Sequence, residues 1–196
     1  MTRIEKVLRD VVEFLNARGQ RYSLVGGLAV SARTEPRFTR DVDLALAVQS
    51  DTEAESVVHG LVQDSYSILA TVEQDQTGRL ATVRLLPPGE PPRGVVADLL
   101  FASSGIESEV VAAAEEVEIL PGLALPVATV GHLIALKVLS AAANRPQDLA
   151  DLHALSAVAT AADLEVARSS VALMEARGFS RGKRLAEELA HLLTRE

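Results

Sequence analysis

Residues 24–48 read LVGGLAVSARTEPRFTRDVDLALAV, and this stretch combines a glycine turn with a carboxylate-bearing strand. Its first part is a short apolar run that ends at Gly26-Gly27, a pattern typical of a strand, a turn and the start of a helix. Thirteen residues separate the glycine pair from the sequence Asp-Val-Asp at 41–43, where apolar residues resume. This second part predicts a strand over 41–48, so strand, turn, helix and strand follow one another closely.

The two aspartates of the second strand share one of its faces. Side chains at positions i and i+2 of a β-strand point the same way, so Asp41 and Asp43 stand side by side while Val42 turns into the core. Two neighbouring carboxylates repel each other unless a cation lies between them. Because Mg²⁺ and Mn²⁺ prefer oxygen ligands, and Mg²⁺ commonly combines one or two carboxylates with water and substrate phosphate, we expect a divalent metal site here.

A third aspartate, Asp98, interrupts the apolar run VVADLLF at 95–101. An ionised carboxylate in such a run carries a desolvation cost unless it is paired or bound to a metal. We therefore predict that Asp98 is the third metal ligand and can take the proton of an attacking hydroxyl. An ordinary salt-bridged residue of the core is the alternative.

The glycine pair supplies a site for an anion. Because they have no Cβ atoms, Gly26 and Gly27 let a phosphate approach the backbone N–H groups at the start of the helix. Carboxylates for a metal and glycines for phosphate together indicate a nucleoside triphosphate that is attacked in line at phosphorus. Each motif alone has a simpler explanation, since glycine pairs form tight turns and Asp-x-Asp occurs on exposed strands.

The remaining chain predicts an α+β fold, with a small mixed β-sheet and flanking helices over 1–127 and a helical half over 128–196 that packs on it. The segment 87–94 is the clearest loop, because its prolines remove backbone donors. Breaks in the helical half are expected near 144–146 and at Gly178. The predicted helices cover 4–18, 28–33, 52–62 and 106–114, and the predicted strands cover 22–25, 41–48, 66–73, 79–86, 95–101 and 116–120.

The composition excludes several classes of protein. Cysteine is absent, which rules out disulfide scaffolds, zinc–thiolate sites and thiol nucleophiles. A formal charge of −8 and only 3% aromatic residues disfavour binding of nucleic acid through a basic face or stacked bases. No apolar run approaches the roughly 18 residues of a membrane-spanning helix, and residues 1–19 lack the apolar core of a secretory signal. We therefore expect a cytoplasmic protein without a membrane partner.

The pattern LVGGLAV…RFTRDVDLALAV resembles the nucleotidyltransferase superfamily related to DNA polymerase β, whose signature is a Gly-Gly or Gly-Ser turn, a spacer and a D-x-D strand. The run R-x-T-x-D-x-D over 37–43 is most similar to the AbiEii-type nucleotidyltransferases, many of which are toxins of bacterial toxin–antitoxin or phage-abortive systems. The resemblance implies the nucleotidyltransferase fold. Arg37, Thr39 and Arg40 precede the second strand and are candidates to touch phosphate or acceptor, with plain solvated loop residues as the alternative. Leu28 departs from the pattern, because many members have Ser there.

A second match lies in the helical half, where Lys137, Asp148 and Asp151 form the pattern K-x10-D-x2-D. It is similar to the lysine and aspartates of AbiEii-like proteins, and by that resemblance Lys137 contacts the triphosphate and assists catalysis. A lysine that extends along the helix surface is the alternative. Asp148 and Asp151 share a helix face, and a structural pairing with Arg145 or Lys137 is as plausible for them as a role in function.

Together these observations predict a Mg²⁺- or Mn²⁺-dependent nucleotidyltransferase that moves a nucleoside monophosphate (NMP) from a nucleoside triphosphate (NTP) to an acceptor hydroxyl. The acceptor stays open between tRNA, a protein and a small cationic molecule such as an aminoglycoside. The acidic charge disfavours long RNA, whereas the AbiEii resemblance favours a toxin that acts on tRNA or protein. One alternative is a non-catalytic nucleotide-binding module with the same fold, and another is a helical half that mainly binds an antitoxin or a second copy.

Overall fold

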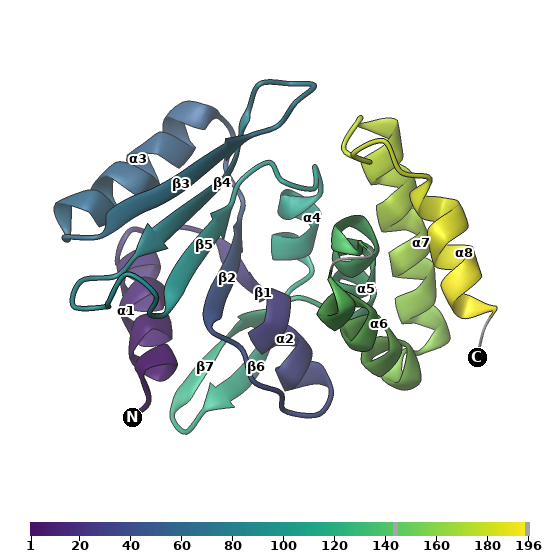
Figure 1. Ribbon diagram of the computed structural model, residues 1–196, viewed down its shortest axis with the longest axis horizontal. Helices are drawn as coiled ribbons and strands as arrows, with labels where there is room; N and C mark the ends of the chain where they lie inside the picture. Colours follow the sequence, from purple (N-terminus) through teal and green to yellow (C-terminus); the bar gives the residue numbers. More distant parts are fainter. Residues whose placement is uncertain (143–144, 195–196) are drawn as a thin grey trace.

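The computed structural model describes residues 1–142 and 145–194, so the break predicted at Asn144 lies outside the described residues (Figure 1). Each helix and strand predicted above is present within two residues of its predicted ends. The helices are α1 (Arg3–Ala17), α2 (Gly26–Arg33), α3 (Asp51–Gln63), α4 (Glu107–Ala112), α5 (Val130–Ser140), α6 (Pro146–Val158), α7 (Ala161–Ala176) and α8 (Leu185–Leu193). The strands are β1 (Tyr22–Val25), β2 (Asp41–Leu46), β3 (Ser67–Glu73), β4 (Leu80–Leu86), β5 (Val96–Leu100), β6 (Glu115–Leu120) and β7 (Leu123–Val127).

The strands of the described chain form one mixed sheet in the order β3-β4-β5-β2-β1-β7-β6. Strand β2 runs parallel to β5, and β1 runs parallel to β7, while the other neighbours are antiparallel. The mixed sheet confirms the predicted fold class. The sheet is wider than the small one predicted, because β7 was not expected from its sequence LALPV. A five-residue run that contains Pro126 is a weak strand signal, since proline removes one donor of the ladder.

Hydroxyl side chains define where four of the helices begin. Thr2, Ser50, Thr129 and Thr160 each precede a helix, and each accepts a hydrogen bond from a backbone N–H in the first turn. Such N-caps satisfy donors that have no partner inside the helix.

One hydrophobic core continues from the α/β half into the helical half. Leu8 of α1, Leu44 of β2 and Ile134 of α5 belong to the same buried cluster. Helix α5 lies close to α7, because Gly131 leaves no Cβ to overlap the backbone of Asp163. In Figure 1 the helices α5 to α8 lie together beside the sheet, with α2 between them and β1. The helical half therefore packs on the α/β half through α2, while the division at residue 127 stays a prediction.

Across residues 1–142 and 145–194, none of the helices has both the length and the hydropathy that crossing a membrane requires.

Candidate active site

The three predicted aspartates lie on neighbouring strands, on one face of the sheet. Asp43 of β2 is opposite Asp98 of β5, and Asp98 is in turn opposite Arg84 of β4. Asp41 lies two residues before Asp43 and therefore on the same face. Val42 between them is fully buried, which confirms the orientation expected from the sequence. Pairing across the strands thus brings together residues that are far apart in the chain.

Asp43 is held against the start of α2. Gly26 has a φ of 64°, and a Cβ on this residue would overlap the Asp43 carboxylate. Burial, followed by repulsion from Asp98 and Asp41, raises the pKa of Asp43 to about 7. A cation beside these carboxylates would favour the ionised form of Asp43 and remove the cost of its burial. Lys137 and the backbone of Gly27 oppose this rise only in part, so, within the described residues, the site still lacks a cation close to the Asp43 carboxylate.

Replacing Gly26 with Ala tests this close approach. Gly122→Ala is the matched control, because Gly122 also has a positive φ, of 71°, but has open space where the Cβ would be. We expect the control to lose about 1 kcal/mol of stability from backbone strain alone. Gly26→Ala should lose at least about 2 kcal/mol more, because its Cβ displaces Asp43. Urea unfolding of both variants measures the difference, and equal losses would mean that the Asp43 contact carries no energy.

Sequence reasoning missed Arg84, which binds Asp98. Its Nε donates to Oδ1 of Asp98 at 2.8 Å and its Nη2 donates to Oδ2 at 2.6 Å, while Nη2 lies 3.6 Å from Oδ2 of Asp41. Asp98 is 6% exposed, so it is a buried, salt-bridged residue, as the alternative interpretation had it. The roles of Asp98 as a metal ligand and base stay predictions. The alternating pattern of β4 could place Arg84 on the same face as Thr82 but could not identify the strand opposite.

Arg37 and Thr39 enclose the second glycine. A Cβ on Gly27 would lie 2.8 Å from Nη2 of Arg37 and 2.8 Å from Oγ1 of Thr39, so the loop before β2 crosses the start of α2 only because glycine is there. Nη2 of Arg37 also donates to Oδ2 of Asp151 in α6 at 2.7 Å. Arg37 is therefore part of an ion pair between the two halves of the chain and not a solvated loop residue.

Lys137 of α5 lies between two buried aspartates of α6. Its Nζ is 2.7 Å from Oδ1 of Asp148 and 2.7 Å from Oδ2 of Asp151, and Arg145 Nε is 2.9 Å from Oδ2 of Asp148. The side chains of Asp148 and Asp151 are 3% and 1% exposed. Both structural pairings that the sequence offered as alternatives are present. Lys137 also lines the cavity described next, where a triphosphate could reach it. Its contact with a triphosphate stays a prediction.

A cavity of about 530 Å³ gathers the residues that the sequence singled out. Its walls come from α2, β2, β5, α5 and the first turn of α6. This volume lies in the range of about 300–1,000 Å³ that is typical of small-molecule sites. The predicted site residues that line it are Gly26, Gly27, Arg37, Thr39, Asp41, Asp43, Asp98 and Lys137.

The oxygen ligands at this site fit a cation held by two carboxylates better than a cation held by three. Within the part of the chain that the structure describes, no three His, Asp or Glu side chains form a group able to hold a metal ion. Asp98 accepts both of its hydrogen bonds from Arg84. Burial raises the pKa of both Asp41 and Asp43, so these two carboxylates would gain from a cation. Two carboxylates suffice, because Mg²⁺ usually keeps water and substrate phosphate as its other ligands.

A glycine turn beside a D-x-D strand, with one cavity over both, is the arrangement of a nucleotidyltransferase, and the comparison with known families agrees. The family model described as "Nucleotidyl transferase AbiEii toxin, Type IV TA system" matches residues 13–196. The chain belongs to this family of nucleotidyltransferases, which confirms the resemblance noted above. A comparison with curated proteins found no match.

Solved structures share the fold at low sequence identity. A nucleotidyltransferase-like antigen from Paracoccidioides brasiliensis is 17% identical with a TM-score of 0.54, over 94% of this chain and 91% of that one. The solution structure of the antibiotic-resistance factor ANT(2'')-Ia is 16% identical with a TM-score of 0.56, over 97% of both chains. The crystal structure of ANT(2'')-Ia in complex with adenylyl-2''-tobramycin is 14% identical with a TM-score of 0.51, over 99% of both chains. At these identities the likeness concerns the fold alone.

Proposed function

We propose that the protein transfers the NMP of an NTP to an acceptor hydroxyl with release of pyrophosphate, and that Asp41 and Asp43 hold the Mg²⁺ or Mn²⁺ this reaction requires. The observation that carries the proposal is the contact between Asp43 and the glycine start of α2 at the floor of the 530 Å³ cavity. This contact brings a place for a metal next to a place for phosphate. Membership of the AbiEii family supports the transfer reaction.

Separate groups of this chain act on the reacting phosphate and on the other phosphates of the NTP. A divalent ion bound by Asp41 and Asp43 would neutralise the charge that develops on the attacked phosphate. The backbone N–H groups of Gly26 and Gly27, at the positive end of α2, donate to phosphate oxygens. Lys137 contributes positive charge from the opposite wall, where Asp148 and Asp151 hold its ammonium group. The substrate is thus oriented by groups that are rigid before it binds.

Arg37 and Thr39 act as phosphate contacts at the edge of this cradle. Arg37 is 22% exposed and is held in place by Asp151, so little of its conformational freedom remains to be lost on binding. Thr39 lies next to Gly27, where its hydroxyl can donate to a phosphate oxygen. Together the two side chains stand in for the serine hydroxyl that Leu28 does not supply.

Asp98 belongs to the acceptor side of the site. It lies one strand from Asp43 and shares the cavity, but Arg84 holds both of its oxygens. Only if Arg84 moved away would the Asp98 carboxylate be free to accept the proton of the attacking hydroxyl or to join the metal ligands. Arg84 and a divalent cation therefore compete for the same carboxylates.

We expect Arg84→Gln to bind Mn²⁺ more tightly than the unchanged protein, by about tenfold. The substitution removes one positive charge beside Asp41 and Asp98 and leaves their carboxylates without a cation. Free Mn²⁺ measured by electron paramagnetic resonance during a titration gives the affinity directly. Arg79→Gln is the matched control. Arg79 directly precedes β4, on the same β3–β4 hairpin as Arg84, and pairs with Asp51 of α3 at 3.1 Å. Equal affinities in both variants would mean that Arg84 does not compete with the metal.

The family description supports a role as the toxin of a toxin–antitoxin pair, with an antitoxin as the partner. For this role we expect growth to stop when the protein is produced in a bacterial host. Production of the Asp41→Asn/Asp43→Asn variant should leave growth unaffected, because the arrest depends on nucleotidyl transfer. Arrest by both proteins at equal expression levels would count against a toxin that acts through this site.

The reaction itself is tested by incubating the purified protein with each labelled NTP, Mg²⁺ and total cell extract. We expect label on an acceptor together with pyrophosphate, and neither product with the Asp41→Asn/Asp43→Asn variant. The fraction that carries the label identifies the acceptor as RNA, protein or small molecule. NTP binding that persists without metal and yields no pyrophosphate would instead indicate a non-catalytic nucleotide-binding module.

A further inference from the structure

The 530 Å³ cavity has two ends, and the glycine turn occupies only one of them. Gly26 follows β1, which is antiparallel to β2, whereas Ser103 follows β5, which is parallel to β2. The glycine turn and Ser103 therefore lie toward opposite ends of these strands, with the paired residues Asp43 and Asp98 between them. With the β- and γ-phosphates at the glycine turn and the α-phosphorus near Asp43, the nucleoside of the NTP would extend toward Ser103.

Apolar side chains line the end of the cavity near Ser103. Leu100 is on the same face of β5 as Asp98 and two residues closer to Ser103, and Leu136 of α5 also lines the cavity. Both leucines are half-buried, so part of their apolar surface is open to a ligand. None of the described residues that line this cavity is aromatic. A base at this end would therefore pack against aliphatic side chains, and polar groups would have to recognise its edge.

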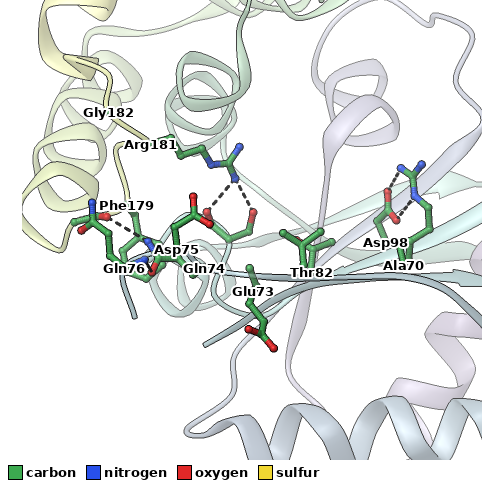
Figure 2. Close-up of a pocket in the computed structure, with 15 residues that line it drawn as sticks. Ala70, Glu73, Gln74, Asp75, Gln76, Thr82, Asp98, Phe179, Arg181 and Gly182 are labelled. Carbon is green, nitrogen blue, oxygen red and sulfur yellow. Dashed lines mark hydrogen bonds and ion pairs between the residues drawn. The ribbon is translucent and has the colours of Figure 1, made fainter. Parts of the chain in front are cut away.

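Arg181 brings such a polar group to this end of the cavity. It belongs to the segment between α7 and α8, and it lines both the 530 Å³ cavity and the adjoining one of about 720 Å³ that Figure 2 shows. Its Nη2 donates to the carbonyl oxygen and the hydroxyl of Ser103 at 3.1 and 2.9 Å. Nε and Nη1 form no hydrogen bond with a described residue. Because arginine has five N–H donors, several remain for a ligand.

Arg181 also differs from the other cations of the cavity in its charge partners. Four of the lining cations form ion pairs with aspartates, and these are Arg37, Arg84, Lys137 and Arg145. Arg181 forms no ion pair with any described residue. Asp75 lies beside it in Figure 2 but is outside ion-pair distance. The donors of Arg181 are therefore not committed to a carboxylate.

The backbone holds Arg181 in a strained conformation. Its φ is 54°, in the left-handed region that residues with a Cβ rarely adopt. On one side of it, Phe179 packs against Gly105. On the other side, Nζ of Lys183 donates to two backbone carbonyl oxygens at the C-terminal end of α5. Strain that is anchored on both sides is typical of residues that bind a ligand.

We propose that Arg181 recognises the base of the NTP by donating a hydrogen bond to an oxo oxygen or ring nitrogen on the edge of the base. These atoms are the acceptors that bases offer to arginine. The proposal rests on the nucleotidyl transfer proposed above, because that reaction places the nucleoside at this end of the cavity. Affinity for a complete NTP then depends on Arg181, whereas affinity for its sugar and phosphates alone does not.

The test measures the affinity of three kinds of probe in the presence of Mg²⁺. They are the four NTPs, ribose 5-triphosphate, which has no base, and inorganic tripolyphosphate, which has neither base nor sugar. Arg181→Met removes every donor, and Arg181→Lys is a second variant that keeps the charge but loses the planar donor group. Arg184→Met is the matched control, because Arg184 lies in the same segment, is 81% exposed and lines neither cavity. A melting curve for each variant shows that it is folded.

We expect Arg181→Met to weaken binding of at least one NTP by about tenfold, because a hydrogen bond from a charged donor is lost. Arg181→Lys should weaken the same NTP by a smaller factor, and Arg184→Met should bind all probes as the unchanged protein does. Binding of ribose 5-triphosphate and tripolyphosphate should stay within about twofold in every variant.

Three results would overturn the contact with the base and leave nucleotidyl transfer intact. Equal weakening of tripolyphosphate would make Arg181 a phosphate contact, and equal weakening of ribose 5-triphosphate would make it a sugar contact. Unchanged affinity for all four NTPs would assign Arg181 to the adjoining cavity instead. If the unchanged protein bound none of the NTPs, the proposed function would fail, and the base contact with it.

Discussion

Replacing Asp43 with Asn is expected to abolish nucleotidyl transfer and, at the same time, to raise the melting temperature of the metal-free protein above pH 7. Activity should fall by at least about a thousandfold, because the variant loses a carboxylate that holds the metal. Stability should rise because the pKa of Asp43 is raised to about 7 by burial and by the neighbouring carboxylates. The asparagine keeps the shape of the side chain and removes the unfavourable charge.

The sign of the pH dependence follows from the same pKa. Between about pH 4 and pH 7 the folded protein retains a proton on Asp43 that the unfolded chain has already lost, so stability falls as pH rises through this window. The loss is complete above pH 7. We therefore expect the gain of Asp43→Asn in EDTA to be absent near pH 4 and to reach a few degrees at pH 8, since ~1 kcal/mol moves the melting temperature by about 2–4 °C for a domain of this size.

Asp41→Asn is the matched control for this prediction. Burial also raises the pKa of Asp41, but the nearby Arg84 opposes the shift. The control should lose activity as well, with a smaller gain in melting temperature at pH 8. If Asp43→Asn instead lowered the melting temperature in EDTA at pH 8, the carboxylate would be stabilising without a metal, and the argument that it needs a cation would fail.

Replacing Lys137 with Met is expected to cause the largest loss of stability, about 3–5 kcal/mol. The ammonium group of Lys137 is 2.7 Å from a carboxylate oxygen of each of two aspartates that are almost fully buried. Arg37 and Arg145 each neutralise one of these aspartates in part, but the variant still leaves buried negative charge without its central partner. Urea unfolding at pH 7 measures the loss.

Two further variants distinguish the cost of leaving a buried charge unpaired from the cost of losing an ion-pair contact. Adding Asp148→Asn to Lys137→Met should recover part of the stability, because it removes one of the carboxylates left unpaired. Lys6→Met removes an exposed ion pair with Asp10 and should change stability by less than about 1 kcal/mol. If Lys137→Met cost no more than Lys6→Met, the network would be a surface feature and could not fix the position of α6 beside the cavity.

The active-site strand and turn were predictable because their signals are local. The i, i+2 spacing of Asp41 and Asp43 puts both carboxylates on one face of any strand, and the glycine pair ends the strand before it. The structure places all eight predicted site residues around one cavity. The resemblance of the short run at 37–43 to the AbiEii family was enough to identify the family.

The partners of these residues were not predictable, because they depend on pairing between distant segments. Arg84 reaches Asp98 only because β4 is antiparallel to β5 in one particular register, and a shift of one residue would turn Arg84 to the other face. The contact of Arg37 with Asp151 joins residues 114 positions apart. The sequence shows that such charges exist, but the packing of α6 against the loop before β2 decides which of them meet.

The central claim is that the α-phosphoryl group of an NTP moves to an acceptor, and double labelling tests it most directly. The purified protein is given NTP labelled at the α-phosphorus in one reaction and at the γ-phosphorus in another, each with Mg²⁺ and cell extract. We predict that the α label appears on the acceptor, that the γ label appears in pyrophosphate, and that the Asp41→Asn/Asp43→Asn variant yields neither. Transfer of the γ label to the acceptor, or transfer by the double variant, would contradict the account.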